Sequence, residues 1–206
     1  MKKFVFATGT SVGRLAIGLL VTILWSFFAY RHFDAFQKTG EWTYLLFGTS
    51  EAVTVLLFAM RTAPKTISED PLDWLFAIGG TFVPLAFAPA NFGVLPMAKH
   101  LISAAMVMQI LGLLSLNRSF ALVAARRELK FGGMYRFMRH PLYASYIVML
   151  TGYVLANTTL TNAAIYFLTL GLLSARMMRE EKHLSQDPAY CAYMQSVPFR
   201  ILPFVL

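Results

Sequence analysis

The densest group of residues that could do chemistry lies at 133–143, where the sequence reads Gly-Met-Tyr-Arg-Phe-Met-Arg-His-Pro-Leu-Tyr. Proline is favoured in the first turn of a helix, so Pro141 predicts a helix start whose free amides attract an anion or a carboxylate. His140 and Tyr143 stand three residues apart and are expected on one side of that start. The group offers a phenol and an imidazole, although a basic membrane anchor with an interfacial tyrosine explains the same residues.

A second charged group follows at 176–184, with the sequence Arg-Met-Met-Arg-Glu-Glu-Lys-His-Leu. Arg176 and Glu180 are four residues apart and are expected to pair along one helix face, while Glu181 points elsewhere. Two neighbouring carboxylates beside arginines could hold the amine or the ribose hydroxyls of a nucleotide-like ligand. The alternative is a solvated helix beside the membrane, whose surface ion pairs are worth less than about 1 kcal/mol each.

A third group lies near the C-terminus. Tyr190 and Tyr193 stand three residues apart and precede the sequence Val-Pro-Phe-Arg-Ile-Leu-Pro at 197–203. Two tyrosines at this spacing with a proline-bounded apolar tail predict an interfacial segment that folds back on the rest of the chain. Taken alone, this segment indicates no particular reaction.

Metal and redox chemistry find little support in the sequence. Cys191 is the only cysteine, which excludes a disulfide framework and a cysteine-rich metal site. The histidines are scattered, and none forms the paired spacing that places two imidazoles on one helical face. No metal site is expected, and the lack of a G-x-G-x-x-G loop excludes a Rossmann-type nucleotide site. The four histidines are His32, His100, His140 and His183.

Membrane helices must position these groups. Of the 206 residues, 57% are apolar and 14% are charged, which lies outside the balance of a soluble globular domain. The region 142–175 is apolar but is interrupted by polar residues at 157–162 that favour a turn, so it predicts two short antiparallel helices. The predicted fold is all-α: a polytopic transmembrane helical bundle of about six spans, the last two forming a hairpin. The other four stretches approach the roughly 20 residues that a bilayer requires: 12–30, 42–60, 72–90 and 97–116.

A few residues in these spans depart from the apolar pattern. Glu51 and Asp73 fall in or near the second and third spans, and each is expected to be a satisfied structural polar group. Pro84, Pro89 and Pro96 are expected to kink or end helices around the third connection.

The distribution of positive charge predicts the orientation of the bundle. With six spans and a cytoplasmic N-terminus, only Arg31, Lys38 and Lys99 of the 18 lysines and arginines face the opposite side, as the positive-inside rule requires. The first span lacks a cleavage site and is expected to be retained. We therefore expect an integral protein of the inner membrane with both termini in the cytoplasm. The net charge of +8 reflects this topology, and no nucleic-acid partner is expected.

The chain is expected to consist of two regions with different functions. Residues 1–116 form four spans and carry no motif, which suits the wall of a substrate cavity. Residues 117–206 carry the three groups and include the transmembrane hairpin 142–175. The connection 117–141 and the tail 176–206 share the cytoplasmic face, so they can build a pocket that a water-soluble cofactor can reach.

Taken together, the three groups resemble the isoprenylcysteine carboxyl methyltransferase and phospholipid methyltransferase families of integral-membrane enzymes. The shared pattern is G-x-Y-x-x-x-R-H-P-x-Y from Gly133, a helical hairpin, R-x-x-x-E-E-x-x-L from Arg176, then Y-x-x-Y from Tyr190 and the closing Arg200 and Pro203. The order and the spacing of these pieces both agree.

The resemblance implies an S-adenosylmethionine-dependent methyltransferase of the isoprenylcysteine carboxyl methyltransferase type, with a lipidic or hydrophobic small-molecule acceptor. The connection, the hairpin and the tail would enclose the cofactor. Three arginines are implied as catalytic residues that orient an anionic substrate group or brace the glutamates: Arg139, Arg176 and Arg200. Six residues are implied to bind the cofactor, the last two through its polar groups: Tyr135, His140, Pro141, Tyr143, Glu180 and Glu181.

A membrane location suits such a reaction. Methyl transfer from a sulfonium is an in-line displacement, and opposite charges cancel in the transition state when the acceptor is a carboxylate or a thiolate, so a water-poor pocket favours it. An anionic acceptor requires no general base, whereas an amine, amide or alcohol acceptor can require one. An isoprenylcysteine carboxylate, a phospholipid amine and a small hydrophobic thiol all stay open as acceptors.

Two other functions also stay open. The sterol C14-reductase group shares a similar R-H-P-x-Y motif and V-P-x-R-x-x-P tail, which implies NADPH-dependent reduction of a sterol or isoprenoid double bond. Glu180 and Glu181 disfavour that function because the 2′-phosphate of the dinucleotide attracts Arg or Lys. The third function is a non-enzymatic lipid-binding or assembly protein whose basic face attracts anionic membrane lipids. The sequence indicates no oligomeric state.

Overall fold

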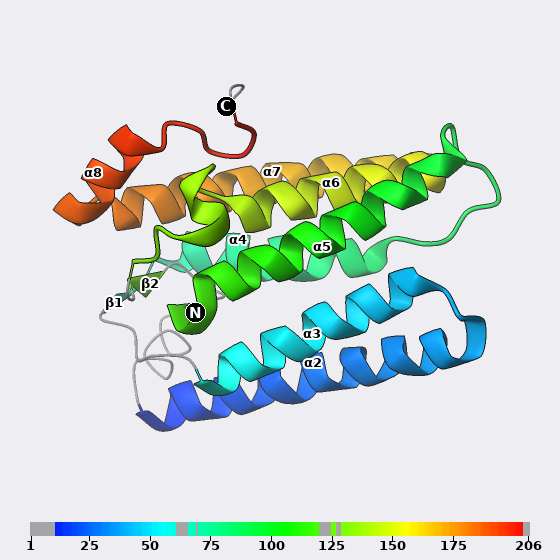
Figure 1. The fold of residues 1–206 in the computed structure, drawn as a ribbon, viewed down its shortest axis with the longest axis horizontal. Coiled ribbons are helices and arrows are strands. Elements are labelled where there is room, and N and C mark those ends of the chain that lie inside the picture. Colours follow the sequence, from blue (N-terminus) through cyan, green and yellow to red (C-terminus); the bar gives the residue numbers. More distant parts are fainter. Residues whose placement is uncertain (1–10, 61–65, 69, 120–124, 127–128, 204–206) are drawn as a thin grey trace.

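The computed structural model describes residues 11–60, 66–68, 70–119, 125–126 and 129–203. Helices dominate this part of the chain (Figure 1), which confirms the predicted all-helical architecture. Strands β1 (Thr66–Ile67) and β2 (Ala125–Arg126) add an antiparallel pair. Short 3-10 turns lie at Val83–Ala86, Pro96–Ala98, Asn117–Ser119 and Gly133–Arg136. The helices are α2 (Ser11–Thr39), α3 (Trp42–Met60), α4 (Pro71–Phe82), α5 (Lys99–Leu116), α6 (Pro141–Ala156), α7 (Leu160–Leu184) and α8 (Pro188–Ser196).

The long helices lie roughly along one direction (Figure 1), and each packs against its neighbours in the bundle. Helix α2 packs on α3, α3 on α5, α5 on α6, α6 on α7, and α7 on α4. Helix α8 and the β1–β2 pair lie together at one end of the bundle, which we refer to as the α8 end. The connection that follows α5 and the tail that follows α7 both lie at this end, so the two charged groups of the sequence are brought to one place.

Three described helical segments are long and apolar enough to cross a membrane: Trp42–Met60, Pro96–Leu116 and Leu160–Leu184, with 19, 21 and 25 residues. They correspond to the predicted second, fourth and sixth spans. Two shorter apolar helices, Pro71–Ala86 and Pro141–Ala156, correspond to the third and fifth. Helix α2 covers the first predicted span, and some of its N-terminal side chains lie outside the described ones. The count of six spans therefore stays a prediction.

The third predicted span, 72–90, is wrong in its length. Regular helix ends at Phe82, and only a 3-10 turn continues the coil to Ala86. Pro84 explains this end because it has no N–H for the helical hydrogen bond and its ring clashes with the preceding turn. The start of the helix is also fixed locally: Asp70 Oδ1 accepts a hydrogen bond from the Leu72 N–H at 2.9 Å.

The hairpin turns at 157–159, as its polar residues predict, but Thr161 and Asn162 belong to α7 and not to the turn. Thr159 caps the helix, since its hydroxyl oxygen accepts from the Asn162 N–H at 3.0 Å. The Asn162 amide in turn donates to the carbonyls of Ala88 and Asn157, at 2.9 and 2.8 Å. Because α7 continues to Leu184, the charged group at 176–184 is the end of the hairpin's second helix.

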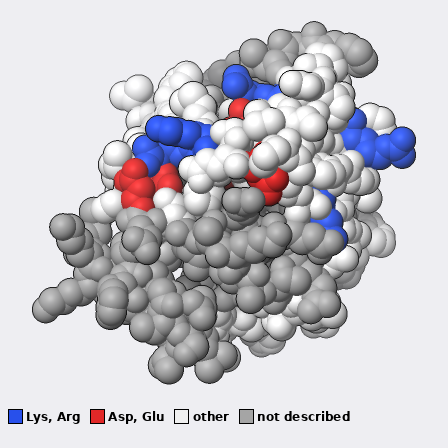
Figure 2. Space-filling model, turned by 90° about the vertical axis from the view of Figure 1, so that its left-hand side faces the viewer, with Lys and Arg blue, Asp and Glu red and all other residues white. Residues whose placement is uncertain are grey.

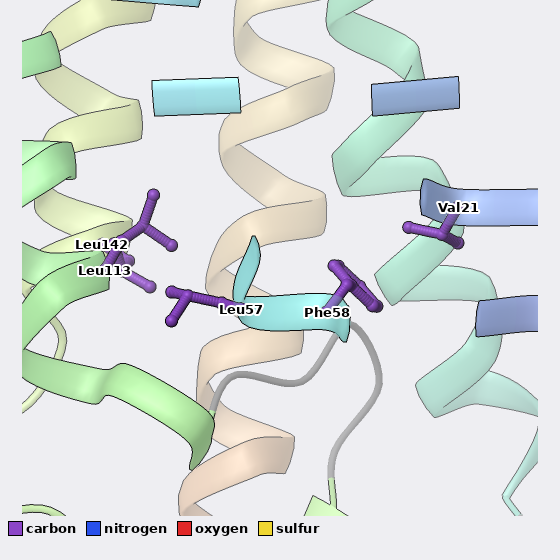
Figure 3. Close-up of a cluster of buried hydrophobic side chains, with 5 residues drawn as sticks. All are labelled: Val21, Leu57, Phe58, Leu113 and Leu142. Atoms are coloured by element: carbon purple, nitrogen blue, oxygen red, sulfur yellow. The ribbon is translucent and has the colours of Figure 1, made fainter. Parts of the chain in front are cut away.

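An apolar cluster joins the helices that lead to the α8 end. Its members come from α2, α3, α5 and α6, so one packed group spans four helices (Figure 3). Each of them is at most 7% exposed, and close van der Waals packing of this kind holds helices together within a membrane. The cluster therefore fixes the start of α6 against the N-terminal helices. Its buried residues are Val21, Leu57, Phe58, Leu113 and Leu142.

Candidate active site

A cavity lies at the α8 end, where the start of α6 and the end of α7 approach α8. The empty space within and at the mouth of the cavity is about 850 Å³, part of which is open to solvent. Aromatic and aliphatic side chains form most of its wall and a few charged groups interrupt them, which is typical of small-molecule sites. Figure 2 looks at this end of the molecule and shows both basic and acidic side chains at its surface. The described lining residues are Leu116, Ser119, Leu129, Lys130, Phe131, Tyr135, Arg139, His140, Leu142, Tyr143, Tyr146, Arg176, Glu180, Leu184, Tyr190 and Tyr193.

Pro141 is the first residue of α6, as predicted, and the C-terminal tail holds the backbone just before it. The Arg139 N–H donates to the Phe199 carbonyl at 2.9 Å, and the His140 N–H donates to the Arg200 carbonyl at 2.8 Å. Two consecutive main-chain hydrogen bonds of this kind fix the direction in which the His140 side chain leaves the backbone. The tail therefore takes part in building the site.

The first carboxylate of the pair, Glu180, meets the cavity wall through Tyr143. The Tyr143 hydroxyl donates to Glu180 Oε2 at 2.6 Å, and the Arg176 guanidinium lies over the Tyr143 ring at 5.6 Å from its centroid. Arg176 and Glu180, which were expected to share one face of α7, therefore both contact Tyr143. A carboxylate, a phenol and a guanidinium meet here in one corner of the cavity.

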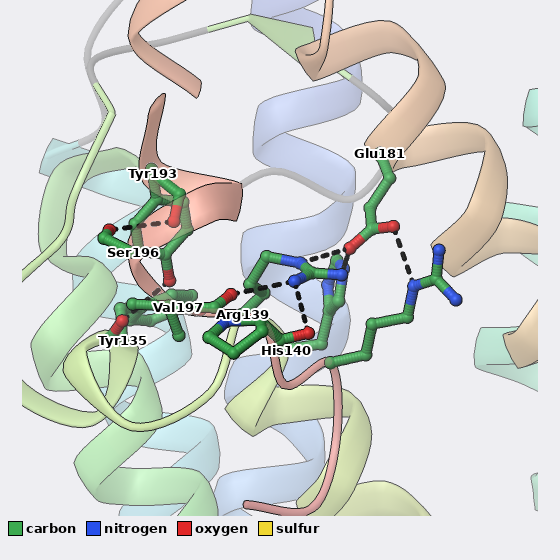
Figure 4. A network of polar contacts seen from close by, with 9 residues as sticks. Tyr135, Arg139, His140, Glu181, Tyr193, Ser196 and Val197 are labelled. Carbon is green, nitrogen blue, oxygen red and sulfur yellow. Dashed lines mark hydrogen bonds and ion pairs between the residues drawn. The ribbon is translucent and has the colours of Figure 1, made fainter. Parts of the chain in front are cut away.

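The second carboxylate, Glu181, faces a different set of partners, as the sequence predicted, and is only 7% exposed. Arg139 Nε donates to Glu181 Oε1 at 2.7 Å, and His140 Nε2 lies 3.0 Å from the same oxygen. Arg200 Nε donates to Oε2, also at 3.0 Å. Figure 4 shows Glu181 facing Arg139 and His140, with Arg139 reaching on toward Val197.

The side of the cavity near α8 is built from buried tyrosines. Tyr193 donates its hydroxyl to the Tyr135 carbonyl at 2.7 Å, which ties α8 to the 3-10 turn at Gly133–Arg136. Burial raises the pKa of Tyr193 to about 12 and holds the pKa of Tyr135 well above its usual range. Both phenols therefore stay protonated at neutral pH, and Tyr193 acts as a donor.

An ion pair also joins the end of α7 to the start of α4. Arg179 pairs with Asp73, which is buried, and with the more exposed Asp70. The Ser68 hydroxyl donates to Asp73 as well. Asp73 is thus a partnered polar group, as predicted, and so is Glu51, whose Oε2 lies 2.7 Å from His32 Nδ1. Because Arg179 directly precedes Glu180, its contacts help to set the rotation of α7 at the cavity.

The structure divides the nine predicted site residues into two sets. Pro141, Glu181 and Arg200 lie outside the described cavity lining. Pro141 starts the helix behind the wall, and the other two form an ion pair beside it. The remaining six meet at the cavity: Tyr135, Arg139, His140, Tyr143, Arg176 and Glu180.

Several lining residues were not singled out from the sequence. Tyr146 follows Tyr143 by three residues, a spacing that puts both on one helix face and could have indicated it. Lys130 and Phe131 precede the first motif directly, with no recognisable pattern of their own. Tyr190 and Tyr193 were noted as part of a tail that folds back on the rest of the chain, but they were not assigned to the site, and the structure places both in the cavity wall.

Comparison with known families concerns the same part of the chain. Residues 95–186 match the model of the isoprenylcysteine carboxyl methyltransferase (ICMT) family, and the matched stretch contains both charged groups and the hairpin between them. A search of curated proteins finds no match. The family and the apolar helices together support a membrane methyltransferase in general. Through residues 95–186, the match supports membership of this chain in the isoprenylcysteine carboxyl methyltransferase family.

Proposed function

We propose that this chain is an integral-membrane methyltransferase that uses S-adenosylmethionine and acts on a lipidic or hydrophobic acceptor. The observation that carries the proposal is that both charged groups of the sequence line one cavity. His140 and Tyr143 come from the first group, and Arg176 and Glu180 come from the second. Residues more than 30 positions apart in sequence thus contribute to one wall.

The chemistry of the wall fits the cofactor. Glu180 offers a carboxylate to an amine or to ribose hydroxyls, and Tyr135, Tyr143 and Tyr190 offer aromatic surfaces for a purine ring and an apolar edge. The carboxylate also attracts a cationic sulfonium.

Of the predicted cofactor residues, we assign direct contact to Tyr135, His140, Tyr143 and Glu180. Pro141 sets the start of α6 behind this wall. Arg176 is the candidate for orienting an anionic acceptor, because it lines the cavity beside Glu180.

Bound S-adenosylmethionine supplies an electrophilic methyl group on a cationic sulfur. The chain's own contribution is to place the acceptor in line with that methyl group and to keep water away from both. Leu116, Leu142 and Tyr146 make one side of the cavity apolar; Leu142 belongs to the packed cluster of α2, α3, α5 and α6, and the other two pack against it. A carboxylate or thiolate acceptor attacks without proton transfer, so no residue is assigned as a general base.

The acceptor classes proposed are an isoprenylcysteine carboxylate, a phospholipid amine and a small hydrophobic thiol. We further propose that membrane lipids surround the bundle and that the α8 end faces the cytoplasm, which lets a water-soluble cofactor meet a membrane-dissolved acceptor. The basic residues of the predicted cytoplasmic segments support this orientation.

Calorimetric titration of the purified protein in lipid nanodiscs with S-adenosylhomocysteine tests the proposal. We expect saturable binding of one molecule per chain and no saturable binding of NADPH, which serves as the matched control. Saturable NADPH binding without S-adenosylhomocysteine binding would support a reductase instead. Binding of neither ligand by the folded protein would leave a non-enzymatic lipid-binding protein.

A further inference from the structure

We propose that Glu181 is a positioning residue, which fastens the C-terminal segment 197–200 to the Arg139–His140 backbone and thereby fixes one wall of the cavity. Its effect on a cofactor rests on the proposed function, whereas its effect on the backbone does not. The proposal separates the two adjacent glutamates: Glu180 faces the cavity, and Glu181 acts through protein groups.

The contacts of Glu181 support a role inside the protein. Its two oxygens meet Arg139, His140 and Arg200 within 3.0 Å, so three of the about four acceptor positions of a carboxylate are occupied by protein donors. Glu181 is buried and is absent from the described cavity lining. Little of this carboxylate is left to hold a ligand.

Arg139 shows what the carboxylate stabilises. Its side chain is only 7% exposed, and Nη1 donates to the carbonyls of Val197 and Pro198 at 2.8 and 2.7 Å. A guanidinium buried this far needs a counter-charge, and Glu181 is its ion-pair partner. Glu181 therefore allows Arg139 to clamp the tail from inside the protein (Figure 4).

Arg200 closes the arrangement from the other side. Its Nε contacts Glu181, and its carbonyl accepts the His140 N–H at 2.8 Å. The tail is thus held through both the side chain and the main chain of Arg200.

Residues 187–203 lie beyond the stretch that matches the family model, yet Tyr190 and Tyr193 line the cavity. Fastening the tail is therefore part of completing the cavity wall.

His140 links the ion pair to the cavity, since it contacts Glu181 and lines the cavity as well. A carboxylate next to Nε2 requires the hydrogen on that nitrogen, which leaves Nδ1 as the acceptor of the neutral ring. The ring packs edge-on against Tyr143, with centroids 5.3 Å apart. Glu181 thus orients a lining side chain without touching a ligand.

Hydrogen–deuterium exchange of peptides covering 137–141, combined with S-adenosylhomocysteine titration, tests the proposal on the full-length protein in nanodiscs. We expect amide exchange at Arg139 and His140 to rise about tenfold in Glu181→Gln and several-fold in Arg200→Ala. S-adenosylhomocysteine affinity should fall about tenfold in Glu181→Gln. Arg200→Lys, which keeps the charge, should restore much of the protection. The matched control is Lys182→Gln, because Lys182 is exposed and adjacent on α7; it should leave both measurements unchanged.

The outcomes separate the two proposals. If wild-type protein does not bind S-adenosylhomocysteine, the proposed function fails, and the exchange data alone still decide the role of Glu181. If Glu181→Gln weakens binding while exchange at 137–141 stays at the wild-type rate, Glu181 contacts the ligand directly and the positioning role is overturned. If Glu181→Gln does not fold, Arg200→Ala and Arg200→Lys decide, and unchanged exchange in Arg200→Ala overturns the proposal.

Discussion

Glu180 and Glu181 are neighbours in sequence but stand in different surroundings. Adjacent residues on a helix point about 100° apart, so the two carboxylates leave α7 toward different elements. Glu180 accepts from Tyr143 at the cavity wall, while Glu181 is enclosed by cations. Substitutions at the two positions should therefore have different consequences.

At Glu180, we expect Glu180→Gln to weaken S-adenosylhomocysteine binding by roughly tenfold to a hundredfold. Losing the charge removes a charge-assisted hydrogen bond worth about 1.5–3 kcal/mol. The thermal midpoint should change little because Glu180 borders the cavity and fills no core position. Calorimetry checks the affinity, with Lys182→Gln as the control on the same helix. An affinity equal to wild type would remove Glu180 from the binding site.

At Tyr193, the raised pKa predicts a dependence of stability on pH. The ordinary tyrosine pKa is 10.0 and burial raises that of Tyr193 to about 12, so the unfolded chain loses this proton first. The contribution is complete below pH 10 and is lost as pH rises toward 12. Thermal unfolding from pH 8 to 12 measures this loss, and Tyr193→Phe should reduce it without removing the part due to other buried tyrosines. An identical alkaline slope in wild type and Tyr193→Phe contradicts the role of Tyr193.

Between elements, the turn at Gly133–Arg136 decides how the first motif meets α5. Gly133 has φ +59, and a Cβ built there would lie 2.3 Å from Ser115 Oγ. The same hydroxyl oxygen accepts from the Met134 N–H at 3.1 Å. Glycine is therefore required at this motif position for both backbone conformation and space.

Gly133→Ala should destabilise the protein by at least about 1–2 kcal/mol, the cost of the left-handed conformation alone. It should also weaken S-adenosylhomocysteine binding, because Tyr135 moves with the turn. Gly132→Ala is a matched control: no atom lies within 4 Å of its Cβ position and its φ is −96. Thermal unfolding and calorimetry compare the two variants. Equal stability of both would show that the turn does not depend on Gly133.

The helices were largely predictable because their causes are local. Apolar length, the start at Pro141 and the turn at Asn157 all act within a few residues of the structure they produce. The third span was overestimated because its apolar pattern continues past Pro84, where the regular helix has already ended. Composition alone does not show where such a pattern stops being helical.

The candidate site was predictable only in part. The sequence indicated which residue types gather at the α8 end, and six of the nine predicted residues line the cavity. The family resemblance implied that Arg139 and Arg200 either orient a substrate group or brace the glutamates, and the structure pairs both arginines with Glu181. Residue spacing alone did not indicate these pairs, since the partners come from three separate segments. The ion-pair partners of a buried group depend on tertiary packing, which no local spacing encodes.

Across the whole molecule, the two ends of the bundle differ. The α8 end carries the cavity and both motif groups, whereas Lys38 and Lys99 lie at the start or end of helices that turn at the opposite end (Figure 1). The predicted orientation puts the α8 end in the cytoplasm, where most of the positive charge falls.

Labelling of single cysteines should test this orientation. In a Cys191→Ser background, we expect Arg136→Cys to react with a membrane-impermeant thiol reagent only in inverted membrane vesicles. Lys38→Cys should react only in right-side-out vesicles. Both native side chains are exposed, so packing does not block either position. Reaction of both cysteines from the same side would contradict the predicted topology.

Ultraviolet cross-linking of radiolabelled S-adenosylmethionine, followed by peptide mapping, tests the central claim most directly because it reports where the cofactor binds. We predict label in peptides from 129–146 and 176–193, suppressed by excess S-adenosylhomocysteine. Label confined to the N-terminal helices, or label that excess S-adenosylhomocysteine does not suppress, would contradict a methyl-donor site at the α8 end.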